Sequence, residues 1–500
     1  MRSTIIILAA ALPVFRASAA TYHVAPGGND QASGQTMATA WATLQHAADM
    51  ALAGDTVLVS PGSYQGFAAM DHSGSVLAPI VFRAADDGVL IDVPCSYNSQ
   101  DGINVENVSW VVVEGFAVVG MPRAGIRTAL SDHVAIRGNT CANNGKWGIL
   151  TGFAEHCIIE HNTCSGSVLE HGIYFSNSAD DPIIRYNHCF DNRANGIHMN
   201  GDASLGGDGV ISNAQVHGNV IHGNGIGGGS GINCDGVRDS WIHGNLLYDN
   251  HASGISLYRI DGGGPSVNNK VYNNTIVNAA DARWCVNITE GCTANQVINN
   301  ILINQHPFRG SIVVDVTALN GFASDHNLVM ERLSPDGDAT ILDLPGWQAL
   351  GYDLNSQVVQ AQSALFAAPG SDFRAVAPDA QQVDAGSAVV SAVVTVDLDG
   401  TPRPQGSAYD IGCYEVAVAT RLDEPIAHLA RVSTDVGAIT VLSLEAHDHV
   451  KVFDLTGRVH FNALVEAGDR HITVSTPGVY LVQVTQARNH ALATTRVFVP

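Results

Sequence analysis

Between Asp101 and about Met330, apolar and polar residues alternate in short runs that recur at a regular interval. Most runs open with the dipeptide Gly-Ile, as in Gly-Ile-Tyr-Phe-Ser, and Gly, Asn and Asp separate one run from the next. The dipeptide begins at Gly102, Gly125, Gly148, Gly172, Gly196, Gly231 and Gly254, with gaps of 23, 23, 24, 24, 35 and 23 residues. Alternation predicts short strands, and a fixed period of this length predicts a stack of similar units.

A column of asparagines repeats between these runs. Its members are Asn139, Asn162, Asn187, Asn219, Asn245, Asn274 and Asn300, and another asparagine often follows five residues later, at Asn144, Asn192, Asn224 and Asn250. Asparagine tolerates the left-handed backbone of tight turns, and stacked asparagine side chains can hydrogen-bond to one another. The pattern therefore predicts an all-β fold, a parallel β-helix in which equivalent residues of successive coils lie about 4.8 Å apart.

The segment before the repeat follows a helical pattern. Residues 40–51 place apolar side chains on one side of a helix, and residues 54–64 return to strand-like alternation. The apolar positions are Trp41, Leu44, Ala48 and Ala51. We expect this helix to cover the open end of the stack, where core side chains and unpaired strand edges would otherwise meet water.

Motifs in these flanking segments resemble a known group of proteins. The runs Tyr22-His-Val-Ala-Pro26, Trp41-Ala-Thr-Leu-Gln-His-Ala47 and Gly54-Asp-Thr-Val-Leu-Val-Ser-Pro-Gly-Ser-Tyr64 are similar to the entry segment of secreted right-handed β-helix proteins of the pectate-lyase-like superfamily. Asp372–Arg374, Val383–Gly386, Asp397–Arg403 and Asp410–Glu415 resemble the closing segment of the same proteins. The resemblance implies a right-handed β-helix and does not point to one family within the superfamily.

The chain is expected to contain an export signal and two domains. Residues 1–20 combine Arg2, an apolar run and the small residues Ala17-Ser-Ala19, which is typical of a cleaved signal peptide. Residues 21–415 are the predicted β-helix domain, divided into a cap (21–74), regular coils (101–330) and a closing segment (334–415). Residues 416–429 are a predicted linker, and residues 430–500 a small β-sandwich.

Two runs in the last domain carry a second resemblance. Val450–Val459 and Pro477–Val484 resemble the type IX secretion sorting domain of Bacteroidetes-type bacteria, although Arg431-Val-Ser433 stands where an Asn-Pro signature is usual. The resemblance implies that this domain interacts with secretion machinery and that the protein is secreted or lies on the cell surface. An ordinary β-sandwich appendage is the alternative.

Composition narrows the choice of partners. The net charge is −23 and the chain has only three lysines, which argues against nucleic acid and anionic membranes as partners. After the signal, no apolar stretch is long enough to span a membrane. The predicted caps at both ends favour a monomer.

The nine cysteines leave at least one unpaired if the others form disulfides. Cys141, Cys164 and Cys189 each follow a column asparagine by two residues, so they form a column of their own. We interpret this column as an inward stack of small apolar side chains, with a disulfide inside it as the alternative.

The strand register predicts which side chains face solvent. The Ile of each Gly-Ile pair is expected to point inward, so the first and third residues after it point outward. This rule places polar side chains of neighbouring coils on one outer face, namely Arg127, Tyr174, His198, Asn200, Asn233, Asp235 and Tyr258. Asp202 and Arg238 lie just past strand ends, and Asp208 and Arg259 lie in the two long insertions beside this face.

These residue types suit a polysaccharide site. Tyrosine stacks on sugars, arginine binds carboxylates, and histidine moves protons near neutral pH. We predict Arg127, Lys146, Tyr174, His198 and Asp235 as catalytic residues. Asn200, Asn233, Arg238, Tyr258 and Arg259 are predicted to bind substrate, and Asp202, Asp208 and Asp235 to bind Ca²⁺. Four basic residues and one acidic residue between Met121 and Lys146 predict a local positive patch.

Three functions follow from this face. The first is a lyase that cleaves a uronic-acid polysaccharide by β-elimination, because the superfamily resemblance implies a base and a cation, often Ca²⁺, at the uronate. The second is a glycoside hydrolase, which needs two carboxylates across the scissile bond, with Asp202 and Asp235 as the pair to measure. The third is a non-catalytic carbohydrate-binding or adhesin protein, since repeat surfaces serve binding well.

Overall fold

A computed structural model describes residues 19–417, 432–435, 438–444, 448–454, 458–474, 476, 478–485 and 492–499. The chain divides into two compact units, Met1–Val418 and Ala419–Pro500. Nearly all of the predicted signal peptide (1–20) and of the predicted linker (416–429) lies outside the described residues.

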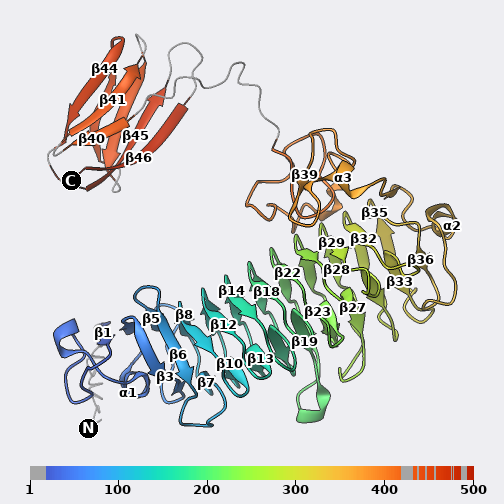
Figure 1. Cartoon of the computed structure of the whole chain (residues 1–500), viewed down its shortest axis with the longest axis horizontal. Coiled ribbons are helices and arrows are strands. Elements are labelled where there is room, and N and C mark those ends of the chain that lie inside the picture. Colours follow the sequence, from blue (N-terminus) through green and yellow to red (C-terminus); the bar gives the residue numbers. More distant parts are fainter. Residues whose placement is uncertain are drawn as a thin grey trace, which may run out of the picture. The chain divides into compact units, whose positions relative to one another are not determined.

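The first unit is a parallel β-helix, as predicted, and its strands form three long sheets (Figure 1). Each coil passes through sheet 1, then sheet 2, then sheet 3, and each strand pairs in parallel with its equivalents in the neighbouring coils. Sheet 1 contains β4 (Phe67–Ala69), β7 (Ile103–Glu106), β10 (Ala124–Ala129), β13 (Trp147–Gly152), β16 (Ile173–Ser176), β19 (Ile197–Asn200), β23 (Ser230–Asp235), β27 (Ser253–Tyr258), β30 (Val286–Ile288), β33 (Ile312–Val314) and β36 (Leu333–Ser334).

The other two sheets complete each coil. Sheet 2 contains β1 (Thr21–Val24), β2 (Thr56–Val59), β5 (Ile80–Ala84), β8 (Val111–Glu114), β11 (Ala135–Arg137), β14 (Ile158–Glu160), β17 (Ile183–Arg185), β21 (Gln215–His217), β25 (Trp241–His243), β28 (Lys270–Tyr272), β31 (Gln296–Ile298) and β34 (Ala323–Asp325). Sheet 3 contains β3 (Gly62–Gln65), β6 (Val89–Val93), β9 (Ala117–Val119), β12 (Thr140–Ala142), β15 (Thr163–Ser165), β18 (His188–Phe190), β22 (Val220–His222), β26 (Leu246–Tyr248), β29 (Thr275–Asn278), β32 (Ile301–Asn304), β35 (Leu328–Val329) and β37 (Gln357–Val358).

The core follows the predicted register. The isoleucine of each of the seven Gly-Ile pairs that mark the repeat is fully buried, whereas Ile226, in the insertion before β23, is 75% exposed. Cys141, Cys164 and Cys189 occupy equivalent positions of β12, β15 and β18. All nine cysteines are buried free thiols, which confirms the inward stack and not the disulfide alternative.

The column asparagines form a continuous hydrogen-bonded ladder between sheets 2 and 3. Asn187 Nδ2 donates to Asn219 Oδ1 (3.0 Å), and Asn219 Nδ2 donates to Asn245 Oδ1 (2.9 Å). These side chains are almost fully buried. The ladder matters because each amide satisfies backbone groups of a turn that the strands leave unpaired.

The N-terminal cap contains η1 (Met37–Thr39) and α1 (Leu44–Met50), and the predicted apolar side of its helical segment is buried. Thr43 caps α1, since its side chain accepts a hydrogen bond from the His46 N–H. Residues 21–100 contain more of the stack than expected, because β1, β2 and β5 already belong to sheet 2. The strands in this segment alternate apolar and polar residues but lack the Gly-Ile dipeptide. The stack therefore begins earlier in the chain than the Gly-Ile repeat indicates.

The closing segment has two parts. In α2 (Leu344–Gln348), buried Leu344 and Trp347 extend the main core and cover the end of the stack. Residues 362–415, with α3 (Gln362–Leu365), β38 (Phe366–Ala368), β39 (Asp372–Ala375) and η3 (Ala388–Val390), fold back along the outside of the last coils. There Phe366 and Phe373 pack against sheet 3, and Val390 and Val394 pack against sheet 2.

The second unit is a small antiparallel sandwich, as predicted. One sheet contains β40 (Val432–Asp435), β41 (Ala438–Leu444) and β44 (Gly468–Thr473). The other contains β43 (Val459–Leu464), β42 (His449–Asp454), β45 (Gly478–Thr485) and β46 (Leu492–Val499). Buried side chains from both sheets, such as Ile439 and Val482, share one core.

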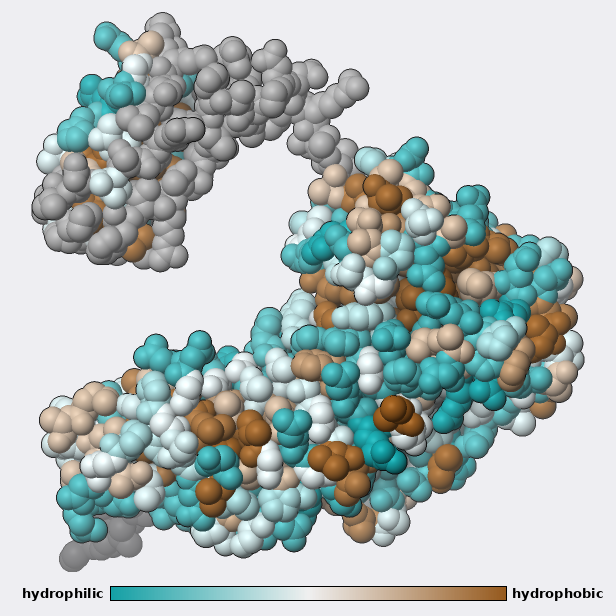
Figure 2. Space-filling view, in the orientation of Figure 1, coloured by the Kyte–Doolittle hydropathy of each residue, from teal (hydrophilic) through white to brown (hydrophobic). Residues whose placement is uncertain are grey.

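Hydrophilic and intermediate residues cover most of the β-helix face that Figure 2 shows. Over the described residues, no helix combines the length and apolar character that crossing a bilayer requires.

Candidate functional site

The outer face of sheet 1 carries two columns of polar side chains. Backbone pairing aligns Tyr174 of β16 with His198 of β19, and His198 with Asn233 of β23. A parallel column aligns Asn200, Asp235 and Tyr258 on β19, β23 and β27. Residues up to 84 positions apart in sequence, from Tyr174 to Tyr258, therefore lie on one face.

A hydrogen-bonded chain runs through this face. The backbone N–H of Asn195 donates to His171 Nδ1 (3.2 Å), and His171 Nε2 lies 3.1 Å from His198 Nδ1. His198 Nε2 in turn lies 3.4 Å from the Tyr258 hydroxyl.

The Asn195 N–H determines how hydrogens are distributed along this chain. A backbone N–H can only donate, so Nδ1 of neutral His171 is an acceptor and its hydrogen is on Nε2. His171 then donates to His198, and His198 donates from Nε2 to the Tyr258 oxygen. Asn233 Nδ2 donates to the same oxygen (2.8 Å). With two donors facing its oxygen, the Tyr258 O–H is free to donate its own hydrogen.

Burial keeps this chain uncharged. It lowers the pKa of His198 to about 3, and burial together with His198 lowers the pKa of His171 well below the usual range. Burial, with Asp235 nearby, raises the pKa of Tyr258 well above its ordinary value. At neutral pH both imidazoles are neutral and Tyr258 is a phenol.

Tyr174 extends the aromatic part of the face. Its ring stacks on His198 (5.0 Å between centroids) and Trp147 (5.4 Å). Its hydroxyl accepts a hydrogen bond from Asn200 Nδ2 (3.0 Å). Burial raises the pKa of Tyr174.

A pocket of about 310 Å³ adjoins the Tyr258 end of the chain. Its neutral polar lining includes Ser230, Asn233, Ser256, Tyr258, Asn287 and Thr289. Arg283 and Glu290 are the charged residues among the lining groups that the structure describes. In the described part of the chain, no carboxylate lies within ion-pair distance of Arg283, so its guanidinium is available to a ligand.

The predicted positive patch is wrong. Arg127 Nη1 lies 2.7 Å from Glu106 and also donates to Asn104 Oδ1 (2.7 Å). Lys146 lies 3.3 Å from Glu170, and its ammonium sits over the Trp147 ring (5.1 Å). Counting charges within one coil missed the carboxylates that the neighbouring coils place beside each cation.

Asp235 is enclosed by an insertion, although its register in β23 predicted a side chain open to solvent. It is buried, and its carboxylate accepts hydrogen bonds from the backbone N–H groups of Ile260, Asp261 and Gly262 at 2.8–3.1 Å. The insertion after β27 thus folds over it. This contradicts the prediction of Asp235 as a catalytic group open to substrate.

The predicted calcium ligands do not converge. Asp202 Oδ1 accepts from the Ser204 N–H (2.7 Å), and Asp208 Oδ1 accepts from the Val210 N–H (3.0 Å), so each holds its own turn. With Asp235 enclosed by the insertion, the three carboxylates form no cluster among the described residues. They therefore do not fit one calcium site, nor are Asp202 and Asp235 a hydrolase pair across a pocket.

Arg238 and Arg259 support an insertion and do not line the Tyr258 pocket. Arg238 belongs to β24 (Val237–Arg238), which pairs with β20 (Ile211–Ser212) outside sheet 1. Its guanidinium lies against Gly264, where an added Cβ would meet Nη2 at 1.8 Å. Arg259 is exposed, and its Nε donates to the Gly262 carbonyl (3.3 Å).

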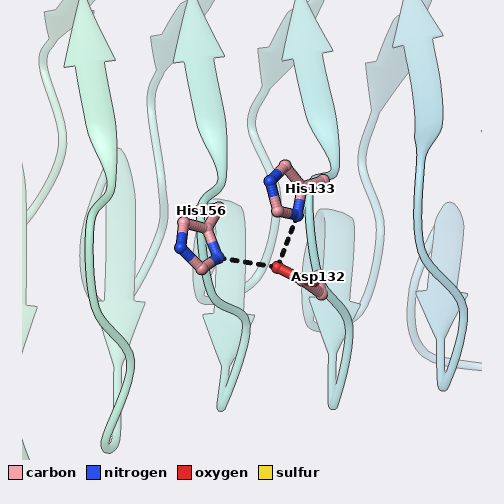
Figure 3. A group of neighbouring side chains, drawn as sticks. All are labelled: Asp132, His133 and His156. Carbon is pink, nitrogen blue, oxygen red and sulfur yellow. Dashed lines mark hydrogen bonds and ion pairs between the residues drawn. The ribbon is translucent and has the colours of Figure 1, made fainter. Parts of the chain in front are cut away.

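One group of possible metal ligands occurs in the described residues, on the turns between sheets 1 and 2 (Figure 3). Nδ1 of His133 and Nδ1 of His156 each lie 2.8 Å from Asp132 Oδ1. Two imidazoles and a carboxylate suit Zn²⁺ chemically. The carboxylate of Asp132 already pairs with both rings, and its hydrogen bond to His156 raises the pKa of that histidine. The three side chains are therefore also explained as an ion-paired cluster that needs no metal.

The sequence reasoning missed His171, Arg283 and Glu290. His171 directly precedes a Gly-Ile pair, where a turn leads into the strand. Alternation of inward and outward side chains holds within a strand, so it did not predict the direction of His171. Arg283 and Glu290 flank β30, which carries no Gly-Ile marker. One signal in the sequence could have revealed His171. The repeat position directly before Gly-Ile is polar in four successive coils, at His171, Asn195, Ser230 and Ser253.

Comparisons with known proteins agree with the fold. A family model described as the right-handed beta helix region matches residues 80–208, and a search among curated proteins gives no match. The crystal structure of pectate lyase Pel9A is 16% identical, with a TM-score of 0.57 over 80% of this chain and 97% of that one. A rhamnogalacturonan lyase is 14% identical (TM-score 0.47; 70% and 91% covered). At such identity, the likeness to Pel9A shows a shared β-helix fold.

Proposed function

We propose that the protein is a polysaccharide-active enzyme that cleaves a uronic-acid polymer by β-elimination at the Tyr258 pocket. The observation that carries the proposal is a phenol, held by the His171–His198 chain, that opens onto a pocket with an unpaired guanidinium. The fold alone does not decide this function, because one fold serves many activities.

Each pocket group has a role in this reaction. Arg283 binds the uronate carboxylate and withdraws charge from it, which acidifies the neighbouring C5 hydrogen. Glu290 removes that hydrogen as a proton, the C4–O4 bond breaks as the C4–C5 double bond forms, and Tyr258 gives its proton to the leaving oxygen. The resulting phenolate is stabilised by the N–H donors of His198 and Asn233. One proton is taken and one is returned.

A glycoside hydrolase is less well supported by this pocket. That reaction requires two carboxylates on either side of the scissile bond. Among the described lining residues, Glu290 is the carboxylate and a cation accompanies it. A pocket with one base and one guanidinium suits proton abstraction beside a carboxylate better than hydrolysis.

The test is to incubate the protein with alginate, pectate and glycosaminoglycans and to follow ultraviolet absorbance of unsaturated product together with new reducing ends. We expect both to rise together on one of these polymers. Arg283→Ala should lower kcat/KM by at least 10²-fold, because removing a charge-assisted contact costs about 3 kcal/mol. Arg83→Ala, on sheet 2 where Arg83 pairs with Glu114, is the matched control.

Other outcomes favour the other functions. Reducing ends without absorbance would indicate a hydrolase. Retention on a polymer column without either product would indicate a binding protein. Assistance by Ca²⁺, which the superfamily resemblance implies, stays a prediction; adding EDTA and then Ca²⁺ to the same assay tests it.

We also propose that the C-terminal unit directs export, which supports a secreted or surface location. The basis is the resemblance of Val450–Val459 and Pro477–Val484 to sorting domains, together with the sandwich that these runs form. Expression in a type IX-competent bacterium, with and without residues 419–500, tests this. Equal amounts of the two proteins in the culture medium would contradict it.

A further inference from the structure

A second pocket lies on the outer face of sheet 2, away from the Tyr258 pocket. Its volume is about 400 Å³. β21 and β25 form one wall, and residues 392–397 of the closing segment form the other. Its lining includes the side chains of Tyr186, His217, Trp241, His243 and Asp397.

Gly244 opens this hollow, and at Gly218 the Tyr186 ring takes the place of a side chain, because an added Cβ would lie 2.5 Å from Tyr186 Cε1. The residue before each ladder asparagine has a left-handed backbone, and at most coils it carries a side chain that covers the sheet edge, as His161, Tyr186, Asn273 and Asn299 do. At the equivalent positions of β21 and β25, Gly218 (φ 65°) and Gly244 (φ 60°) have none. A Cβ on Gly244 would meet no atom within 4 Å, so the space beside it is open.

Aromatic and imidazole rings surround the hollow. The rings of His217 and His243 are parallel, 4.8 Å apart, and Tyr186 packs edge-on against His217 (5.4 Å). Trp241 is half-buried beside them. Tyrosine and tryptophan in such positions offer an apolar surface with a polar edge, which suits the face of a sugar ring.

The two histidines have polar atoms without protein partners. His243 is only 8% exposed, yet no group in the described residues hydrogen-bonds to its ring or to that of His217. Neither ring has a nitrogen among the fully enclosed polar atoms that lack a partner, so these nitrogens are open to the cavity, where a ligand or water can pair with them. Their location along the cavity wall makes them available to ligand hydroxyls.

Neutral groups and a single carboxylate line the cavity in the described part of the chain. Burial lowers the pKa of His217 to about 4 and that of His243 to about 3, so both rings are uncharged at neutral pH. Asp397 is buried, and its carboxylate accepts hydrogen bonds from the backbone N–H groups of Asp399 and Glu415. Arg185, next to Tyr186, is paired with Glu160 (2.6 Å). Among the described lining residues there is no cation to bind a uronate, and the one carboxylate, Asp397, would repel it.

We infer that this cavity is a binding site for an uncharged sugar unit of a polysaccharide, separate from the Tyr258 pocket. Trp241 and Tyr186 contact the apolar face of the sugar ring. Neutral His217 and His243 exchange hydrogen bonds with its hydroxyls. The site would hold a neutral residue or branch of the polymer while another part of the chain reaches the reactive pocket, and it would equally serve a protein that only binds carbohydrate.

The test measures binding of glucose, galactose, xylose and rhamnose oligosaccharides, with galacturonate oligomers as the charged comparison, by calorimetry and by tryptophan fluorescence. We expect one neutral sugar to bind with a Kd of about 1 mM or tighter. Gly244→Asn should weaken this binding at least 10-fold, because asparagine tolerates the left-handed backbone and its amide fills the hollow. Gly138→Asn is the matched control, since Gly138 has the same backbone (φ 64°) in the same column and no atom within 4 Å of an added Cβ.

A second variant guards against misfolding. Trp241→Leu should abolish the fluorescence change on sugar addition and weaken binding, while Tm stays near that of the wild type. The inference is overturned if no neutral sugar binds, or if Gly244→Asn binds as tightly as Gly138→Asn. Cleavage of short uronate oligomers should be unaffected by Gly244→Asn, so this result is independent of the proposed lyase activity.

Discussion

At the scale of single residues, the direction of each hydrogen bond decides what Tyr258 can do. The Asn195 N–H determines the tautomer of His171, and His171 determines that of His198. The Tyr258 oxygen therefore receives two hydrogen bonds and keeps its own hydrogen for another acceptor. At the same buried position, a tyrosine without these two donors would release its proton to a substrate less readily, because its phenolate would be less well stabilised.

Replacing Tyr258 with phenylalanine tests this role. Removing a proton donor should lower kcat by about 10²–10⁴-fold with a smaller change in KM, since the ring and its packing remain. Steady-state rates of unsaturated product formation measure the effect. Tyr97→Phe, which alters a tyrosine that is 54% exposed, is the matched control. A Tyr258→Phe enzyme as active as this control would exclude Tyr258 as the donor.

At the scale of elements, the asparagine ladder joins sheets 2 and 3 from Asn139 to Asn327. Asn219 shows how many hydrogen bonds one ladder residue makes. Its Nδ2 donates to the carbonyl of Ile184 (2.9 Å) and to Asn245 Oδ1, and its Oδ1 accepts from Asn187 Nδ2. Because all of these groups are buried, deleting the amide leaves several of them without partners.

Asn219→Ala should accordingly lower the free energy of unfolding by about 2–3 kcal/mol. Urea unfolding followed by circular dichroism measures this, with Asn29→Ala as a control on an exposed turn, expected to change stability by less than about 0.5 kcal/mol. Equal stabilities of the two variants would mean that water replaces the lost amide.

The insertion after β27 depends on one carboxylate from the neighbouring strand β23. Asp235→Ala removes the acceptor for three consecutive backbone N–H groups, so we expect residues 260–262 to lose protection in hydrogen exchange by at least 10-fold. Peptides from β10 should exchange as in the wild type. Asp208→Ala, which frees a single N–H, is the matched control. Unchanged exchange at residues 260–262 would show that Arg259 and Arg238 hold the loop without Asp235.

At the scale of the whole molecule, the β-helix buries histidines that must stay neutral. Burial lowers the pKa of His198 and His243 to about 3, against 6.5 when unperturbed. A lowered histidine pKa means that below pH 6.5 the unfolded chain binds protons which the folded chain does not. The contribution of these groups to stability is therefore complete above pH 6.5 and falls as the pH falls.

We expect the free energy of unfolding to fall between pH 6.5 and 5, by about 1.4 kcal/mol per pH unit for each such histidine. Urea unfolding at pH 7.0, 6.0 and 5.0 measures the slope. His243→Gln should reduce it, whereas His72→Gln, on a half-buried turn, should not. His156 acts in the opposite direction, because Asp132 raises its pKa, but its exposure makes that contribution small. Constant stability over this range would show that the core takes up protons without cost.

The predictions made from sequence succeeded where they depended on period and alternation. The recurring Gly-Ile marker predicted that Tyr174, His198 and Asn233 would align although 24 and 35 residues separate them, and their backbone pairing agrees. They failed where a neighbouring coil or an insertion supplies the partner. Glu106 neutralises Arg127, and residues 260–262 enclose Asp235, although nothing in the local sequence of either residue indicates it.

The sequence by itself determined the β-helix, its inward and outward positions and the asparagine ladder, because each follows from a repeat that stacking must respect. Only the tertiary structure decided which polar groups remain available. Whether a side chain is paired, enclosed or open depends on groups brought beside it by adjacent coils and by the returning closing segment. For that reason Arg283 and the hollow at Gly244 emerge from the folded molecule and not from its repeat.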